Sequence, residues 1–160
     1  MPNIDATLIV AFVTATCVLP TGCASTDESD ASAVLQRLYT LPDPDFAAFH
    51  DDQRRPAYYS PRIHALALAK TACFQQVFGM DGLDFDYIVP GQDYDIRDLS
   101  IETISQSGDA ATARVAFVTM GEAVTLDYSL LRVDGRWLID DTMYDGHSLA
   151  GDLAAPCQSD

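Results

Sequence analysis

The chain has 160 residues, with 24 Asp and Glu against 9 Lys and Arg, so its formal net charge is −15. This acidity argues against nucleic-acid binding and against adhesion to an anionic membrane surface, because both depend on attraction to negative phosphates. Since 48% of the residues are apolar, the chain can bury a core of ordinary size and fold as one domain, which argues against a disordered protein.

The first feature along the chain is an uncharged, mostly apolar run of 14 residues, from residue 6 to residue 19. A helix that spans a bilayer needs about 20 apolar residues, so this run better fits the apolar region of an export signal. No Lys or Arg precedes the run, and Asp5 does, which departs from the usual signal pattern. A short buried helix is the alternative interpretation.

The sequence allows two alternative positions for the end of this signal. Gly22 and Ala24 form the small-x-small pair that favours cleavage after Ala24. Alternatively, the segment LPTGC resembles a bacterial lipoprotein box, in which Cys23 carries the lipid. In that case the lipid anchor is the protein's contact with the membrane, and both alternatives stay open.

These features predict three parts: an export signal over residues 1–24, a short acidic tether over 25–30 and one domain over 31–160. The expected location is the periplasm or outer cell envelope of a bacterium, where the protein is either secreted or lipid-anchored.

The cysteine pattern agrees with export. Removal or lipidation of the signal end leaves Cys73 and Cys157 as the single remaining pair. In an oxidising compartment such a pair favours a disulfide. Metal binding is the alternative for two cysteines, but no CxxC or HxxxH spacing accompanies them, so we predict neither a metal nor a cofactor.

Helical patterns occupy the first half of the domain. Asp30 can cap a first helix, which ends before Pro42 because residues that precede proline avoid the helical conformation. The segment from residue 46 to residue 55 carries a weak signal for a short helical turn. A second, clearer helix starts at Ser60-Pro61, with Ser as N-cap and Pro in the first position, and ends before Gly79.

After residue 97 the apolar period changes from that of a helix to that of a strand. Asp134-Gly135 is typical of a type I′ hairpin turn. The predicted strands are Leu99–Ser105, Ala111–Met120, Ala123–Val133 and Arg136–Met143. Hairpins in series make an antiparallel meander, and the helices come first. The sequence therefore predicts an α+β fold, with N-terminal helices packed on one face of a curved four-stranded antiparallel sheet.

The last of these strands contains the first candidate functional residue. By alternation, Trp137, Ile139, Asp141 and Met143 share one face, and the first two should face the core. An unpaired carboxylate on the same face is costly to bury. Three outcomes are open for Asp141: it pairs with an arginine, it lies at the wet mouth of a pocket, or a bulge turns it outward.

The segment LDFDYIVPGQDYD, residues 83–95, is rich in acids. It does not match a calcium loop, because Ile88 occupies a ligand position and no glutamate closes the loop. A solvated acidic loop is one interpretation. The other is that Asp86, Gln92 and Asp93 turn beneath the sheet and supply polar groups to a cavity.

Further pocket candidates are Tyr59 and Arg62 at the start of the second helix and Tyr128 on the third strand. Tyr59 can donate a phenolic hydrogen bond, and Arg62 can neutralise Asp86 or Asp141. Packing of the tyrosine with the arginine on the surface is the alternative.

The segments YYSPRIHAL, LDFDYIVPGQDYD and GRWLIDDTM, with the hairpins between the last two, resemble small bacterial envelope domains of the NTF2-like superfamily over residues 30–153. The resemblance implies a cone, in which a curved sheet wraps helices around a pocket. Members include isomerases, dehydratases, transport factors, immunity proteins and ligand binders. In the enzymes a carboxylate or histidine inside the cone takes a proton near a carbonyl, and Asp141 and Asp86 are the candidates for that role here. No matching His–Asp pair is visible in the sequence.

Three functions follow, in order of preference. The first is non-enzymatic binding of a small molecule or a partner protein in the cell envelope. The second is an inhibitor or immunity protein whose acidic surface matches a cationic toxin or enzyme. The third is an isomerase, dehydratase or hydrolase that uses a pocket aspartate as general base.

Overall fold

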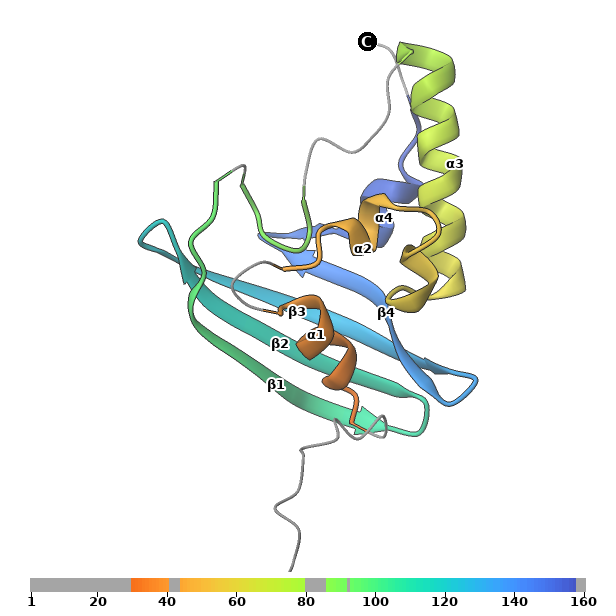
Figure 1. Ribbon diagram of the computed structural model, residues 1–160. Coiled ribbons are helices and arrows are strands. Elements are labelled where there is room, and N and C mark those ends of the chain that lie inside the picture. Colours follow the sequence, from red (N-terminus) through yellow and green to blue (C-terminus); the bar gives the residue numbers. More distant parts are fainter. Residues whose placement is uncertain (1–29, 41–43, 80–85, 92, 158–160) are drawn as a thin grey trace, which may run out of the picture.

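The computed structural model describes residues 30–40, 44–79, 86–91 and 93–157. The expected signal, the tether up to residue 29, the candidate lipidation site Cys23 and the pocket candidate Gln92 lie outside these residues. The elements, in chain order, are α1 (Ala33–Leu38), α2 (Ala47–His50), the 3-10 turn η1 (Arg55–Ala57), α3 (Pro61–Phe78), β1 (Arg97–Ser107), β2 (Ala110–Thr119), β3 (Glu122–Val133), β4 (Arg136–Tyr144), β5 (His147–Ser148) and α4 (Leu149–Ala154) (Figure 1). Within the described residues no helix is long and apolar enough to cross a bilayer.

The strands form one antiparallel sheet in the order β1-β2-β3-β4-β5. The predicted α+β fold with an antiparallel meander is confirmed, and each predicted strand lies within two residues of an observed one. The two-residue strand β5 is an addition to the four predicted strands. At the β3–β4 turn Asp134 has φ 50° and Gly135 has φ 81°, as the type I′ signal predicts.

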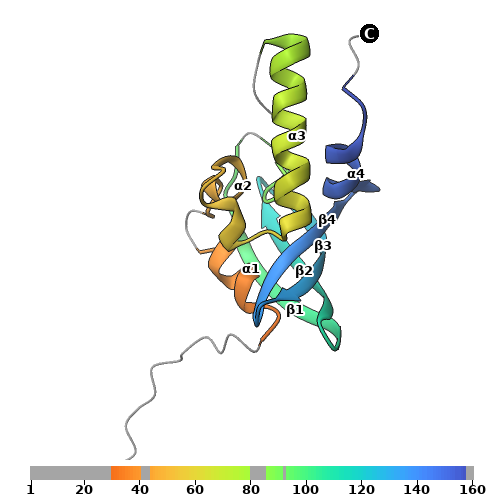
Figure 2. The same cartoon turned by 90° about the vertical axis from the view of Figure 1, so that its right-hand side faces the viewer.

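One face of the sheet carries the core. On β2 and β3 buried and exposed residues alternate, as expected for strands with one solvated face. The buried side chains of these two strands are Ala111, Ala113, Val115, Phe117, Thr119, Val124, Leu126, Tyr128 and Leu130. Helix α1 lies across this face of the curved sheet (Figures 1 and 2).

Helix α3 is fixed to the edge of the sheet at its first residues. The backbone N–H of Ser60 donates to the carbonyl of Ile139 on β4 at 2.8 Å, and the Ile139 N–H donates to the carbonyl of Tyr58 at 2.8 Å. The Ser60 hydroxyl oxygen also accepts from the N–H of Ile63 and so caps the helix. Gly79 ends the helix with φ 68°, a left-handed conformation that favours glycine. Both predicted boundaries of this helix are confirmed.

The C-terminal segment is fastened to α3 by a disulfide. Cys73 and Cys157 are bonded, with their Cα atoms 6.2 Å apart, which confirms the predicted pair. One helical turn earlier, the Lys70 ammonium donates to the carbonyl of Ala155 at 2.9 Å. These two links hold the residues that follow α4 against the middle of α3.

Candidate functional site

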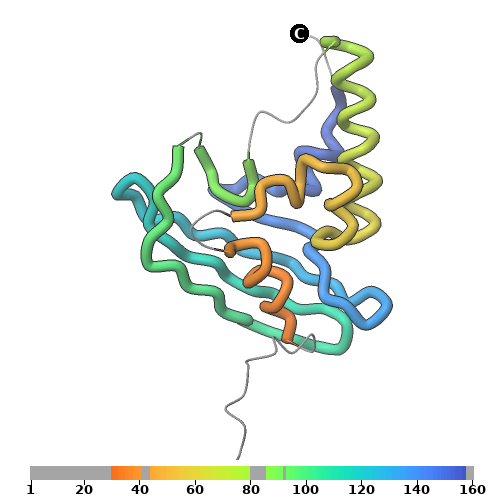
Figure 3. Tube along the Cα trace, viewed as in Figure 1, coloured from red at the N-terminus to blue at the C-terminus, as the bar shows by residue number. Residues whose placement is uncertain are grey.

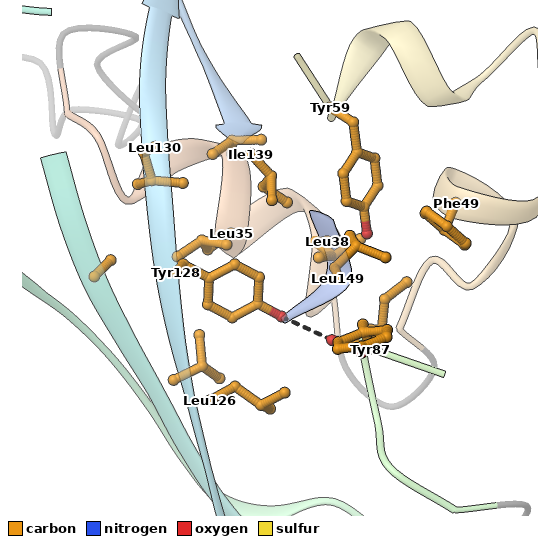
Figure 4. Close-up of a cluster of buried hydrophobic side chains, with 14 of the residues drawn as sticks. Leu35, Leu38, Phe49, Tyr59, Tyr87, Leu126, Tyr128, Leu130, Ile139 and Leu149 are labelled. Atoms are coloured by element: carbon orange, nitrogen blue, oxygen red, sulfur yellow. Dashed lines mark hydrogen bonds between the residues drawn. The ribbon is translucent and has the colours of Figure 1, made fainter. Parts of the chain in front are cut away.

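Three buried tyrosines from distant parts of the chain meet beneath the sheet. Tyr39 follows α1, Tyr59 precedes α3 and Tyr128 lies on β3, and each is exposed by 2% or less. Figure 4 shows Tyr59 and Tyr128 projecting into the same apolar core, which includes Leu38 and Leu149. We refer to the hydroxyl groups of Tyr39, Tyr59 and Tyr128 as the phenol cluster.

Two members of the phenol cluster are joined to each other and to the backbone. The Tyr39 hydroxyl donates to the carbonyl of Ile88 at 2.6 Å, and its oxygen lies 2.7 Å from the Tyr128 hydroxyl oxygen. Because a phenol has one proton to donate, Tyr128 is the donor in that pair. The Tyr128 hydroxyl also lies 3.4 Å from the carbonyl oxygen of Tyr87.

The third member, Tyr59, differs from the other two in its hydrogen bonding. Its ring packs edge-on against Phe49 with centroids 5.4 Å apart. Within the part of the chain that the structure describes, its hydroxyl makes no hydrogen bond, although the side chain is 1% exposed. Its oxygen is not one of the fully enclosed polar atoms without a partner, which among the described residues are Nδ1 of His64 and the hydroxyl oxygens of Thr103 and Thr142. Tyr59 therefore offers a nearly buried donor for which a ligand acceptor is the natural partner.

Asp86 and His50 lie at the rim of the phenol cluster. One carboxylate oxygen of Asp86 accepts from the backbone N–H of Ile88 at 2.7 Å, and the other lies 3.8 Å from Nε2 of His50. The Asp86 side chain is 21% exposed and that of His50 is 50% exposed. Figure 3 traces the segment 86–91, which carries Asp86, beside the segment 44–50, which contains α2 and carries His50. The pair is thus a partly solvated acid–histidine contact.

The pKa values of the phenols decide what chemistry the cluster offers. Burial raises the pKa of Tyr39, Tyr59 and Tyr128 well above the ordinary value of 10, and the negative charge of Asp86 raises each of them further. At neutral pH all three phenols are therefore protonated and uncharged. They serve as hydrogen-bond donors, and they do not serve as bases.

The structure brings together three of the seven predicted pocket residues, namely Tyr59, Asp86 and Tyr128. Arg62 does not join them, because its guanidinium binds the carboxylate of Asp140 at 2.8 and 3.2 Å. The predicted neutralisation of Asp86 or Asp141 by Arg62 is therefore wrong, and the neighbouring acid takes that place. Asp93 is described and exposed.

Asp141 is turned away from the core by a β-bulge, the third of the three outcomes considered for it. The register between β3 and β4 shifts between Leu130↔Ile139 and Ser129↔Asp141, so the common face of Trp137 and Ile139 does not continue to Asp141. The predicted common face is wrong beyond Ile139 for this reason. Beyond the bulge, Thr142 is the buried residue.

The Asp141 carboxylate is occupied by structural contacts. It accepts from the N–H of Thr142 at 2.8 Å, from the N–H of Ala150 at 2.9 Å and from the hydroxyl of Ser148 at 2.7 Å. Ser148 is itself the N-cap of α4. Asp141 thus anchors the start of α4, and both oxygens of its carboxylate are engaged in these hydrogen bonds.

His50, which contacts Asp86, was not predicted from the sequence as a site residue. It lies in the weakly helical segment before α3, 36 positions from Asp86, and no motif links the two. The only sequence signal was the presence of a histidine within a short, partly apolar turn. Among the described residues, no group of three or more potential metal-ligating side chains gathers at this or another place.

The outer face of the sheet also carries two open hollows, of about 300 and 270 Å³. Both are lined by Thr112 and Ser129, and their charged groups are paired: Arg114 binds Asp127, and Asp140 binds Arg62. These hollows lie on the opposite side of the sheet from the phenol cluster.

Comparison with known proteins gives little guidance. No protein-family model matches the chain, and no curated protein matches it. Among solved structures, a phospholipid-binding protein from Ralstonia solanacearum, solved in complex with a phospholipid, is similar over 78% of this chain and 69% of its own, with 15% identity and a TM-score of 0.31. A TM-score this low does not define a common fold.

Proposed function

We propose that this protein is a non-enzymatic binding domain of the bacterial cell envelope, with an NTF2-like cone, and that it holds a small ligand at the phenol cluster. The observation that carries this proposal is the buried Tyr59 hydroxyl, a donor without a partner among the described residues, beside two phenols that hydrogen-bond each other. A ligand with an apolar body and one hydrogen-bond acceptor satisfies both the hydroxyl and its apolar surroundings.

The protonation of the cluster favours binding over catalysis. Proton abstraction needs a base whose pKa lies near the working pH, whereas the raised pKa values leave the three phenols protonated. Asp86 remains as the candidate base of the enzymatic alternative. Its carboxylate is partly solvated and already accepts from the N–H of Ile88, so it does not lie in the water-excluding pocket that proton abstraction from a bound substrate requires.

Location in the envelope is supported by two features. The disulfide between Cys73 and Cys157 is typical of proteins in oxidising compartments. The apolar run over residues 6–19 has the length of an export signal.

A thermal-shift screen tests the proposal. The purified protein is heated with a panel of uncharged apolar compounds, each of which carries a carbonyl or ether oxygen. At a concentration of 100 times Kd, a binder stabilises the fold by about 2.7 kcal/mol, which raises the melting temperature by several degrees. If no compound in the panel raises it, the proposal is contradicted.

A second function is supported by the distribution of acids. The antiparallel register places the starts of β1 and β3 and the end of β4 at one end of the sheet, where Asp95, Asp98, Glu122 and Asp145 are all exposed. Such a surface suits a cationic partner, as expected for an inhibitor or immunity protein. This function predicts that binding to a basic enzyme weakens steeply as salt is added, whereas ligand binding at the phenol cluster is insensitive to salt.

A further inference from the structure

The phenol cluster is almost closed to solvent. Each of its three tyrosines is exposed by 2% or less, so a ligand reaches the Tyr59 hydroxyl only after a part of the chain that covers it moves. The buried side chains around the cluster come mostly from helices and strands, whereas residues 86–91 belong to neither. We refer to residues 86–91 as the strap.

The strap is held in the core by its side chains more than by its backbone. Tyr87, Ile88 and Val89 are exposed by 3, 1 and 1%. Within the part of the chain that the structure describes, however, the backbone of residues 88–91 makes no hydrogen bond to the backbone of another segment. The Ile88 N–H donates to the strap's own Asp86 carboxylate at 2.7 Å. A segment that is not paired through its backbone is expected to open locally while the sheet stays intact.

The carbonyl groups of the strap lie against the donors of the phenol cluster. The Tyr39 hydroxyl donates to the carbonyl of Ile88 at 2.6 Å, and the Tyr128 hydroxyl lies 3.4 Å from the carbonyl oxygen of Tyr87. The strap thus faces the cluster with the same kind of acceptor that a ligand would present. When the strap leaves, Tyr39 loses its acceptor, and a carbonyl group of a ligand restores that hydrogen bond.

Two polar contacts fasten the strap at the protein surface. Asp86 lies 3.8 Å from Nε2 of His50, and the Tyr87 hydroxyl donates to the carboxylate of Asp152 on α4. The side chains of His50 and Asp152 are 50 and 43% exposed, so water can replace both contacts when the strap moves. Because water compensates for their loss, these contacts hold the strap in place without preventing its release.

We propose that the strap is a gate of the ligand site. In the closed protein the Ile88 carbonyl occupies Tyr39, and in the open protein a carbonyl group of the ligand takes its place. The ligand class is therefore an apolar compound with two carbonyl groups, one that accepts from Tyr39 and one that accepts from Tyr59. This inference rests on the proposed ligand site and adds its regulation. Because the ligand competes with the strap, its apparent affinity is proportional to the fraction of open protein.

Hydrogen exchange of the full chain, followed by NMR, tests the gate without a ligand. The amide of Ile88 is expected to exchange at least about a hundredfold faster than the amides that join β2 to β3. Its rate should change little with urea, because local opening exposes little surface. Tyr87→Phe removes the hydrogen bond to Asp152 and should speed the exchange of Ile88 about fivefold.

Tyr58→Phe is the matched control for this variant. The Tyr58 hydroxyl donates to Asp45 at 2.8 Å, which is the same kind of hydrogen bond outside the strap. The exchange of Ile88 should therefore be unchanged in Tyr58→Phe. An Ile88 amide with the rate and urea dependence of the β2–β3 amides overturns the gate, since the strap would then open only when the whole protein unfolds.

A second measurement uses N-octanoyl-leucine methyl ester, an uncharged apolar compound with two carbonyl groups. Calorimetry is expected to show about fivefold tighter binding to Tyr87→Phe than to the wild type or to Tyr58→Phe, because the loosened strap competes less. The bound ester should also speed the exchange of Ile88.

The outcomes separate the gate from the ligand site itself. Equal affinity of the ester for the three forms, or slower exchange of Ile88 in its presence, overturns the gate while the ligand site stands. If single-carbonyl compounds bind and the ester does not, the ligand class is overturned. Failure of every compound in the thermal-shift panel contradicts the proposed function, and the exchange of Ile88 still decides whether the strap opens.

Discussion

The phenol cluster and the acidic pair Asp140–Asp141 both place polar groups next to the core, but the fold treats them in opposite ways. The phenols are buried almost completely and remain uncharged, and one of them has no hydrogen-bond partner among the described residues. The two carboxylates stay at the edge of β4, and each is held by several donors.

The difference follows from the cost of desolvation. Burying a neutral hydroxyl without a partner costs a few kcal/mol at most, whereas an unpaired buried charge costs much more. Both acids of β4 therefore accept several hydrogen bonds, by which Asp140 anchors the start of α3 and Asp141 anchors the start of α4. The group left without a partner is the neutral hydroxyl of Tyr59, for which this costs the least free energy. A buried hydroxyl without a hydrogen-bond partner is a better marker of a binding site than a carboxylate that already accepts several hydrogen bonds.

The largest expected effect comes from alkaline pH. The phenols of the cluster have raised pKa values in the folded protein, so they bind their protons more tightly there than in the unfolded chain. The contribution of these phenols to stability is accordingly constant below about pH 10 and falls above it, by about 1.4 kcal/mol per pH unit for each buried phenol. Urea unfolding between about pH 9 and 11.5 measures this slope, and the part of the tyrosinate absorbance that comes from these three buried phenols should appear together with unfolding. A flat profile would show that the phenols ionise without loss of the fold.

Next in size is the loss of the Asp141 anchor. Asp141→Ala leaves the N–H of Ala150 and the hydroxyl of Ser148 without their acceptor, and we expect a loss of about 3 kcal/mol in the free energy of unfolding. Asp127→Ala on the neighbouring strand is the control, since its exposed pair with Arg114 contributes less than about 1 kcal/mol. Equal losses in the two variants would contradict the anchoring role of Asp141.

A smaller effect is expected within the cluster itself. Tyr128→Phe removes the hydrogen bond to Tyr39 without changing the shape of the core, so the free energy of unfolding should fall by about 1 kcal/mol. The alkaline slope should fall by about 1.4 kcal/mol per pH unit at the same time. An unchanged slope would mean that Tyr128 does not contribute to the pH dependence.

The smallest effect belongs to the Arg62–Asp140 pair. Although three hydrogen bonds join them, the Arg62 side chain is 51% exposed, so solvent screens the pair. Arg62→Gln should cost about 0.5 kcal/mol, and less still in high salt. A loss of unfolding free energy as large as that of Asp141→Ala would contradict this expectation. It would show that the pair of Arg62 and Asp140 stabilises the fold as strongly as Asp141 does.

The sequence was sufficient for most of the elements, although not for β5 and α4, and insufficient for the contacts between them. Strand alternation, the Ser60-Pro61 start and the Gly79 end of α3, and the Asp134-Gly135 turn are local signals, and each is present as predicted. The disulfide was predictable because removal of the expected export signal, or lipidation at its end, would leave one pair of cysteines. Apart from the disulfide, which joins residues 84 positions apart, these features depend on neighbours in the chain.

The site depended on facts that no local pattern contains. A one-residue shift in the pairing of β4 turned Asp141 outward, and alternation alone does not reveal where a bulge occurs. The His50–Asp86 contact joins two irregular segments through tertiary packing. Tyr59, Asp86 and Tyr128 were proposed as pocket residues on chemistry alone, and the structure places them together.

The most direct test of the account is the affinity of a ligand from the thermal-shift panel for three forms of the protein, measured by calorimetry. Tyr59→Phe is expected to weaken binding about tenfold, the value of one buried hydrogen bond. The same substitution should raise the free energy of unfolding of the ligand-free protein, because it removes a hydroxyl that has no partner. Tyr94→Phe, which alters an exposed tyrosine, should bind as the wild type does. Equal affinity of all three forms would contradict the claim that the phenol cluster is the binding site.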